Sequence, residues 1–520
     1  MNGFLDSIGY GQWILHALVV LPLLGAIPVL LGPPSSAKWT ALGVTALELV
    51  LSAGLWWALE PGVGTLQMVS STPWIPGWGI AYRVGIDGIS LVMVLLTTLM
   101  MPLSVLGSWR YITKQERAFY ALMLTLLTGL VGVFVALDLF VFYVFFEIML
   151  IPMYFIIGIW GGANRLYAAI KFFIYTMAGS LLMLVAIVAL VWRIQAATGY
   201  ISFSYDTVLQ HAGAAGALAP WLFAAFAIAF AIKVPIFPFH TWLPDAHVEA
   251  PTAGSVLLAA VMLKIGTYGF LRFAVPFFPD VAMSPVVSRI VVVLAVIGVI
   301  YGALVAMVQP DIKKLVAYSS VSHLGFVMLG IWGGTVQSVQ GSLMVMISHG
   351  LSTGALFLLI GMIYERRHTR LIADYGGIAR VVPVFSLIFT VVTLSSIGLP
   401  GLNGFVGEFL VLLGSFTAYP VATVLATTGV IFAAGYLLWA LQRMLYSRLD
   451  NPENERLTDL DRREVAIMLP LLAGIVWLGL YPAPVLRRME PATQRYLQLT
   501  RPAGATMPVA AGGYTVEARP

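Results

Sequence analysis

The chain has 520 residues, of which 60% are hydrophobic and only 10% charged, with a formal net charge of +5. Soluble proteins carry about 25% charged residues, so this composition excludes an ordinary soluble domain and indicates a helical protein that crosses a membrane many times. The chain contains no cysteine, which excludes disulfides, thiolate zinc sites and cysteine-ligated iron–sulfur clusters within it.

Apolar runs of about 20 residues recur along the whole chain, and a helix of that length spans a bilayer. We expect an all-α polytopic fold with about fourteen transmembrane helices, near residues 12–32, 39–58, 86–108, 118–136, 138–160, 168–192, 219–237, 253–272, 288–308, 313–333, 337–363, 382–413, 421–442 and 464–482. The first run lacks a basic leader and a small-residue cleavage site, so we expect it to be retained. In the polar loop 59–85, the pieces Leu66–Ser70 and Ile80–Val84 are expected to form a hairpin.

The lysines and arginines lie mostly in loops, so the positive charge is no sign of nucleic-acid binding. With the N-terminus outside, they favour the inner side by roughly two to one, as the positive-inside rule requires. The inner group is Lys38, Arg110, Lys114, Arg117, Arg165, Lys171, Lys313, Lys314, Arg366, Arg367, Arg370, Arg380, Arg443, Arg448, Arg456, Arg462 and Arg463. Both termini are therefore predicted on the outer (periplasmic) side of a bacterial inner membrane. The polar tail 483–520 is expected on the outer surface or against a neighbour.

The stretch AIKVPIFPFHTWLPDAHVEAPT, residues 231–252, interrupts the seventh helix. A lysine such as Lys233 inside a membrane costs about 2.5–3.5 kcal/mol. Pro235 and Pro238 follow it and lack the backbone donors that a helix needs, so the helix is expected to break beside the charge. Non-helical backbone at membrane depth is tolerated inside protein or along a water-filled cavity. The stretch therefore predicts a buried ionisable site.

The twelfth helix carries a second interruption, SSIGLPGLNGFVGEF, which ends near Glu408. It lies five helices after the first, so the two broken helices are expected to run in opposite directions. That arrangement is typical of inverted repeats in transporters. We predict two inverted five-helix repeats, 118–272 (helices 4–8) and 288–448 (helices 9–13). Residues 1–117 would hold helices 1–3 with the outer hairpin, and 464–482 the last helix.

Glu147 lies in DLFVFYVFFEIMLIPMYF with apolar residues on both sides, and intramembrane acids are usually functional. A buried glutamate and a buried lysine stabilise each other's charges only when they are close. We therefore expect Glu147 to set the charge state of Lys233. The alternative is a structural glutamate that ties helices together.

Four further ionisable residues lie inside later spans: Lys264, His323, His349 and Glu408. Lys264 is too deep to reach the interface easily, which favours a second proton carrier. The two histidines are expected to link Lys264 to Glu408 through water, and Glu408 to act as the exit residue. Each also has a structural alternative, because a lone buried histidine is usually a satisfied core residue and a buried carboxyl can be neutral and hydrogen-bonded.

His240 and His247 follow the first helix break, together with Asp245 and Glu249. Their spacing fits no zinc site, so no metal is expected. Imidazoles and carboxylates titrate near neutral pH, which makes a proton entry from the inner side one interpretation. A polar network that closes the broken helix is the other.

Taken together, four stretches identify a family: FEIMLIPMYFIIGIWGG, AIKVPIFPFHTWLPDAHVEAPTAGSVLLAAVMLKIGTYGFLRF, DIKKLVAYSSVSHLGFVMLG and SHGLSTGALFLLIGMIYERRHTR. They resemble the antiporter-like membrane subunits of respiratory complex I over nearly the whole chain. Within that family the resemblance is strongest to the subunit M group, which includes mitochondrial chain 4. Glu408 stands where subunits L and N are expected to carry lysine, and the length leaves no room for the lateral helix of subunit L. The stretches YRVGIDGISL and GLNGFVGEF also suit the M group.

The resemblance implies proton pumping coupled to NADH oxidation and quinone reduction elsewhere in a complex. It implies functional roles for Glu147, Lys233, Lys264, His349 and Glu408, and neighbours L and N with the lateral helix of L. FMN, iron–sulfur clusters, NADH and quinone are expected on other subunits, and lipids around this one. A subunit of a multi-subunit sodium/proton antiporter is the alternative function, and a passive scaffold is a third.

Overall fold

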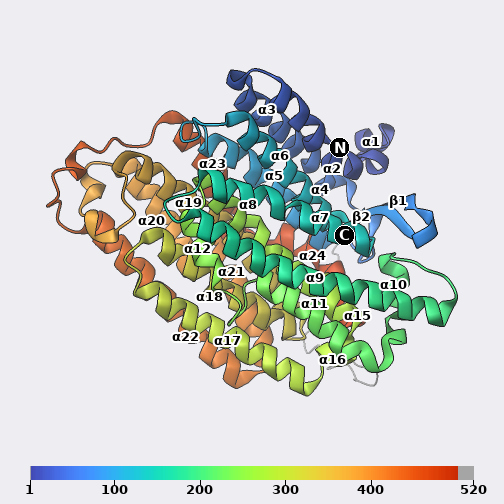
Figure 1. The fold of residues 1–520 in the computed structure, drawn as a ribbon. Helices are drawn as coiled ribbons and strands as arrows, with labels where there is room; N and C mark the ends of the chain where they lie inside the picture. The colour runs from blue at the N-terminus through green and yellow to red at the C-terminus, as the bar shows by residue number, and fades with distance from the viewer. Residues whose placement is uncertain (1, 502–520) are drawn as a thin grey trace, which may run out of the picture.

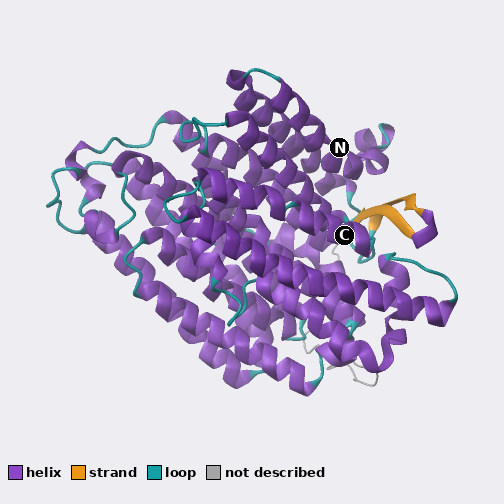
Figure 2. Ribbon diagram, in the orientation of Figure 1, coloured by secondary structure: helices purple, strands orange, loops and turns teal. Residues whose placement is uncertain are grey.

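The computed structural model describes residues 2–501, and most of them are helical (Figure 2). A helix satisfies every backbone donor within one segment, which is what hydrocarbon demands. Thirteen described helices are long and apolar enough to cross a membrane. They are α2 (Tyr10–Leu31), α3 with α4 (Pro34–Ala53, Leu55–Ala58), α5 (Gly88–Gly107), α6 (Glu116–Val135), α7 with α8 (Leu139–Ile148, Leu150–Trp160), α9 (Arg165–Thr198), α10 to α11 (Tyr205–His211, Ala219–Lys233), α13 to α15 (Thr252–Phe277), α17 (Pro285–Met307), α18 (Ile312–Trp332), α19 (Val336–Arg367), α22 (Pro420–Leu441, continued to Tyr446) and α23 (Arg462–Leu480).

The fourteenth expected crossing, 382–413, is split into two shorter apolar helices, α20 (Pro383–Ile397) and α21 (Asn403–Phe416). The predicted all-α membrane fold is thus confirmed. The relation of the two halves as inverted repeats stays a prediction. Short helices fill the connections: α1 (Asn2–Ser7), α12 (Trp242–Glu249), α16 (Pro279–Ala282), and single 3₁₀ turns at Pro76–Trp78, Ile372–Asp374, Ile378–Arg380 and Asn454–Arg456.

The hairpin predicted in the loop 59–85 is present and longer than expected. Strand β1 (Gln67–Ile75) pairs antiparallel with β2 (Ile80–Ile86). Gly79 supplies the left-handed residue of the turn, with φ of 66°. Figure 1 shows the hairpin projecting beside the N-terminal helices.

The first helix break lies where the sequence places it. Helix α11 ends at Lys233, and α12 begins at Trp242. The indole N–H of Trp242 donates to the carbonyl of Ile232 at 2.8 Å, which satisfies one of the carbonyls that the broken helix leaves free. Lysine and break are therefore adjacent, as predicted.

The second break needs glycine. Helix α20 ends at Ile397, and the chain then passes through Gly398 (φ 84°) and Gly401 (φ 93°) before α21 begins at Asn403. Other residues are strained at such positive φ values. The hydroxyl of Ser348 in α19 donates to the Asn403 carbonyl at 2.9 Å, so the break is tied to a central helix.

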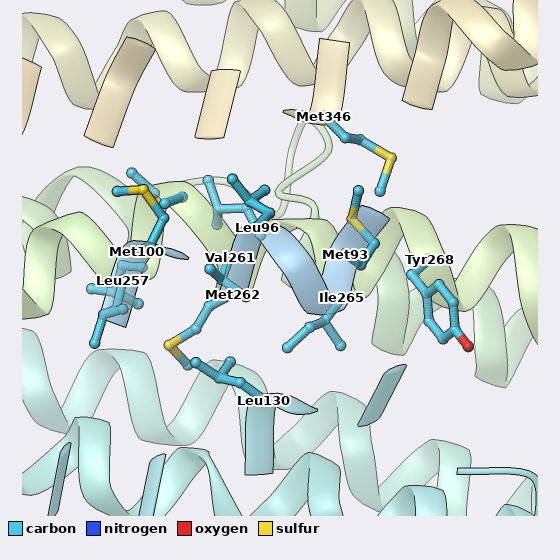
Figure 3. Packing of buried hydrophobic residues seen from close by; sticks show 14 of the residues in the cluster. Met93, Leu96, Met100, Leu130, Leu257, Val261, Met262, Ile265, Tyr268 and Met346 are labelled. Atoms are coloured by element: carbon cyan, nitrogen blue, oxygen red, sulfur yellow. The ribbon is translucent and has the colours of Figure 1, made fainter. Parts of the chain in front are cut away.

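The helices differ strongly in burial. Thr252–Phe277, α18 and α19 are enclosed by protein over their apolar length, whereas α3, α22 and α23 leave large apolar side chains exposed, as expected next to lipid or neighbouring chains. Figure 3 shows the dry packing along the buried helix, where these labelled side chains meet: Met262, Ile265, Met93, Leu96, Leu130 and Met346. The ionisable residues of this helix therefore sit inside the molecule and not at its surface.

The tail predicted as 483–520 is partly structured. Residues Ala483–Leu499 form helix α24, which packs on α5 and α19. The guanidinium of Arg488 donates to the Leu59 carbonyl at 2.6 Å, and Gln340 of α19 donates to the Leu486 carbonyl at 3.1 Å. The remainder of the predicted tail, 502–520, lies outside the described residues.

Candidate functional site

Lys264 lies in the middle of the enclosed helix Thr252–Phe277, and its side chain is fully buried. A π-helical turn, Leu258–Met262, comes just before it, and such turns are frequent at functional sites. The amine donates to the Ala259 carbonyl at 2.6 Å and lies 2.7 Å from Nδ1 of His349 in α19. Those two atoms are its hydrogen-bonding partners among residues 2–501, and neither carries a negative charge.

The contacts continue from His349 to Glu408. The ring of His349 lies 5.7 Å from that of His323 in α18, centre to centre. On the far side, Nδ1 of His323 lies 2.9 Å from a carboxylate oxygen of Glu408 in α21. Four buried residues on four helical segments thus form one series, Lys264, His349, His323 and Glu408, called here the Lys–His–His–Glu cluster.

A small polar cavity bridges the widest gap in this cluster. Its volume is about 10 Å³, close to the space that a single water molecule needs. It is lined by both histidines, Glu408, Val345, Gly404, Ser348, Ser352, Ser395 and Ser396. A water here can hydrogen-bond to both rings, so the cluster can pass a proton along its whole length.

No hydrogen bond or ion pair within 4.0 Å joins Lys233 to Glu147, and the expectation that Glu147 sets the charge state of Lys233 stays a prediction. The Lys233 amine has no hydrogen-bond partner among the described residues. It lies 5.2 Å from the centre of the Phe146 ring and 5.4 Å from that of Phe172. Two aromatic faces at such distances can stabilise a desolvated cation.

Glu147 is the penultimate residue of α7, two positions before Met149, where the helix is interrupted. The residue is half-buried, and one of its carboxylate oxygens is buried without a hydrogen-bond partner among residues 2–501. Glu147 therefore lies near the surface of this chain, whereas Lys233 lies inside it. Within residues 2–501, no hydrogen bond or ion pair joins Lys233 or Glu147 to a member of the Lys–His–His–Glu cluster.

His240 does not join the cluster either. Its ring packs among Phe237, Tyr301 and Tyr318, at centre distances of 5.7, 5.2 and 6.4 Å. Nearby, Asp245 is bound by Lys171 at 2.7 Å. These are the contacts of His240 and Asp245 beside the break, and the choice between proton entry and a closing network stays a prediction.

Sequence reasoning missed a buried ion pair on the same helix as Lys264. Arg272 lies at the end of the predicted helix 253–272, and it is buried and donates to Asp87 at 2.6 Å. Tyr268 and Ser90 complete this network, with the Arg272 Nε donating to the Tyr268 hydroxyl at 3.2 Å. The spacing could have indicated this burial, because Arg272 follows Lys264 by eight residues, about two helical turns, and so lies near the same face of the helix.

A second missed residue is Glu48 in α3, which is fully buried with neither carboxylate oxygen hydrogen-bonded within residues 2–501. Its run of apolar neighbours resembles that of Glu147. As for metals, no group of three histidine, aspartate or glutamate side chains in the described residues is arranged to hold an ion.

Comparison with known proteins gives concordant results. The sequence model described as "NADH:quinone oxidoreductase/Mrp antiporter, TM" matches residues 136–433, and "NADH-ubiquinone oxidoreductase chain 4, amino terminus" matches residues 19–133. NADH-quinone oxidoreductase subunit M of Rhodobacter capsulatus is 44% identical over 503 residues, which cover 94% of this chain and 97% of that one. A chain of respiratory complex I from Thermus thermophilus superposes with a TM-score of 0.85 at 32% identity, over 94% of this chain and 100% of that one. A chain of the Mrp complex from Dietzia sp. DQ12-45-1b superposes with a TM-score of 0.78 at 24% identity, over 92% of this chain and 52% of that one, and shows the shared fold alone.

Proposed function

Because the chain belongs to the subunit M and chain 4 family of NADH-quinone oxidoreductase membrane subunits, we propose that it moves protons across the membrane through the Lys–His–His–Glu cluster. The chain is a membrane subunit of that enzyme complex and works as part of it. Oxidation of NADH and reduction of quinone supply the energy. We place FMN, the iron–sulfur clusters, NADH and quinone on other subunits.

The observation that supports this proposal is the continuity of the cluster. Lys264, His349, His323 and Glu408 are distant in sequence, yet successive members are in hydrogen-bonding contact or separated by one water-sized cavity. Burying such groups is costly, and intramembrane ionisable residues are generally functional. A purely structural core would not need four of them in a row.

The chemistry follows from the donor and acceptor roles. The Lys264 ammonium can only donate, so it gives its proton to Nδ1 of a neutral His349. His349 releases a proton from Nε2, which is buried and without a hydrogen-bond partner in the described residues, to water in the cavity. His323 accepts from that water and passes a proton from Nδ1 to the Glu408 carboxylate. Glu408 then delivers it toward the outer side.

Lys233 and Glu147 are proposed to control this transfer electrostatically. The Lys233 amine lies near two phenylalanine rings and has no counter-ion within 4.0 Å among residues 2–501, so its charge can respond to a change of charge nearby. Motion of Glu147, or compensation by a charge on a neighbouring subunit, would change the stability of the Lys233 cation. Because Glu147 is half-buried in this chain, such a neighbour can reach it.

The cellular setting is proposed from charge and family. The distribution of basic residues supports both termini on the outer side of a bacterial inner membrane. Subunits L and N are the proposed neighbours, with the lateral helix of L across one face and lipids around the rest. The exposed apolar side chains of α3, α22 and α23 are suited to such contacts.

The experiment is to reconstitute the complex with Lys264→Met in this subunit, which keeps the side-chain length and removes the proton-binding nitrogen. Proton output per electron pair should fall, while electron transfer with an uncoupler present continues. Lys114→Met, an exposed lysine in a loop, is the matched control and should pump normally. Normal pumping by the Lys264→Met complex would overturn the proposal.

A sodium/proton antiporter subunit is the less supported alternative. The first family model covers both kinds of protein by its description, but the subunit M relative is much more similar than the Mrp chain. Sodium-dependent transport by membranes that lack quinone would favour the antiporter.

A further inference from the structure

A large groove lies on the surface between α17 and α22, two helices that run side by side (Figure 1). Its volume is about 1160 Å³, more than the roughly 300–1,000 Å³ of a typical small-molecule site. None of the four residues of the Lys–His–His–Glu cluster lines it. We call it the α17–α22 groove, and its occupant must be larger than an ordinary small ligand.

One face of α17 forms the floor of this groove. The lining residues recur at intervals of three and four positions from Pro285 to Leu304, which places them along a single stripe of the helix. Arg289 and Leu304 are 15 positions apart, which corresponds to about 22 Å along the helix axis. The hydrocarbon of one leaflet is about 15 Å thick, half of the bilayer core. The stripe is therefore long enough for the whole length of an acyl chain.

Helix α22 forms the second wall near the starts of the two helices. Its first turns, Pro420–Leu425, line the groove. Farther along, α22 packs directly on α17, and a methyl group on Gly429 would lie only 2.2 Å from the side chain of Val299. Because the helices touch there, the space between them opens toward the end at which both begin.

The charge of the groove is concentrated at this open end. Arg289 is the one charged residue that lines it, its side chain is exposed, and no carboxylate lies within 4.0 Å of it in residues 2–501. A guanidinium binds a phosphate through two parallel hydrogen bonds, and the starts of two helices add partial positive charge. Tyr419 lines the same end, as is common where a protein meets lipid headgroups.

The rest of the groove is suited to hydrocarbon. Along the stripe and the facing wall, Val293, Leu304 and Leu425 are 49%, 44% and 47% exposed. Apolar side chains left open over such a length call for an apolar occupant. A phosphate at one end and a long hydrocarbon at the other are the two parts of a phospholipid.

We propose that the α17–α22 groove binds one anionic phospholipid, with its phosphate on Arg289 and an acyl chain along α17 as far as Leu304. In the orientation proposed above, α17 begins on the outer side, so the lipid belongs to the outer leaflet. A quinone carries no negative charge and would leave Arg289 without a partner. The site does not depend on the proton route through the cluster.

The far end of the groove reaches the first helix break. Tyr301 lines the groove, and its ring lies 5.4 Å from that of Phe237 and 5.2 Å from that of His240, centre to centre. Both of these residues lie in the segment between α11 and α12. A bound acyl chain therefore packs against the aromatic group beside the break.

Photolabelling of the intact complex tests this site. The complex is placed in phosphatidylcholine nanodiscs with a little phosphatidylglycerol that carries a diazirine at the end of one acyl chain, and adducts are mapped by mass spectrometry. We expect adducts on α17 between Ile297 and Leu304, displaced by unlabelled phosphatidylglycerol and not by more phosphatidylcholine. Arg289→Gln should raise the half-labelling concentration about tenfold. Arg193→Gln, which changes an exposed arginine near the end of α9 outside the groove, is the matched control and should label normally.

A second variant fills the groove and keeps the arginine. Val293→Trp changes a half-exposed side chain, so the complex should assemble on blue-native gels while the adducts between Ile297 and Leu304 are lost. Absence of these adducts from the unsubstituted complex would overturn the inference, because another occupant, such as a neighbouring subunit, would then cover the groove. Equal labelling by a diazirine phosphatidylcholine, displacement by quinone, or normal labelling of Arg289→Gln would overturn it as well.

Discussion

The amine of Lys264 lies 2.7 Å from Nδ1 of His349, although 85 positions separate them in the chain. A lysine ammonium has three donors and no acceptor, so the contact joins a group that can lose a proton to one that can take it. Neither side chain is hydrogen-bonded to a carboxylate in the part of the chain that the structure describes, and both are buried. The contact therefore favours transfer of a proton from Lys264 to His349 over a permanently charged Lys264.

Removal of the first acceptor should interrupt the series. His349→Gln keeps a polar side chain but cannot carry a proton, and general acid–base groups typically contribute about 10²–10⁴-fold. We expect proton output per electron pair to fall as in Lys264→Met, with assembly of the complex intact. His211→Gln, which removes a half-buried histidine of α10 distant in sequence from the cluster, serves as the control. Pumping at the wild-type ratio by His349→Gln would show that the series does not run through this ring.

The helix break at Gly398 should be more sensitive than its companion at Gly401. Both glycines have positive φ, so alanine at either costs about 1–2 kcal/mol of folding free energy. A methyl group at Gly398 would also lie 2.9 Å from a carboxylate oxygen of Glu408, whereas at Gly401 its nearest neighbour is at 4.0 Å. We expect similar losses of thermal stability but a fall in pumping only for Gly398→Ala. Equal pumping by the two variants would argue that the position of the Glu408 carboxylate does not affect proton transfer.

Lys233→Met should abolish the electrostatic control of proton transfer by Lys233, while the Lys–His–His–Glu cluster keeps its structure. Glu147→Gln should act on the same step, because the two residues are proposed to control one another's charge. Both single variants are expected to assemble and to lose most of the pumping by this subunit. Proton output per electron pair checks this, and blue-native gels check assembly. A double variant that pumps less than either single one would mean that the residues act separately.

A stability prediction concerns Glu464, which is buried and receives both arms of Arg366, at 2.6 and 2.9 Å. The pair joins the end of α19 to the start of α23. Glu464→Gln loses the charge and one acceptor, and should destabilise the chain by about 1–3 kcal/mol. Glu453→Gln breaks the ion pair with Arg367. The Glu453 side chain is 70% exposed, so this change should cost less than about 0.5 kcal/mol. Thermal melting of the detergent-solubilised protein should rank them in that order; the reverse ranking would contradict the assignment.

Much of the fold could be predicted because a lipid bilayer admits only long apolar helices with satisfied backbone groups. Apolar runs mark the spans, and a lysine followed by two prolines marks a break, as α11 and α12 show. The second break was equally evident from the proline and glycines of SSIGLPGLNGFVGEF. These signals are local in sequence, so one chain is enough to detect them.

The contacts within the site depended on packing and were harder to foresee. The sequence indicates that Lys233 and Glu147 are buried or nearly so, but not that Phe146 and Phe172 surround the amine. Likewise, Arg272 reads as a basic residue near a helix end, and only the approach of α5 shows its pairing with Asp87. Such contacts depend on which side chains of two packed helices meet, and hydrophobic periodicity does not show which helices pack together.

The central claim is that Lys264 and Glu408 belong to one series, and a double-variant measurement tests it most directly. Steps in series are non-additive, whereas independent contributions add. Proton output per electron pair should be compared for Lys264→Met, Glu408→Gln and the complex that carries both changes. We predict that the double variant pumps no less than the more impaired single variant. A double variant whose loss equals the sum of the two single losses would contradict the account.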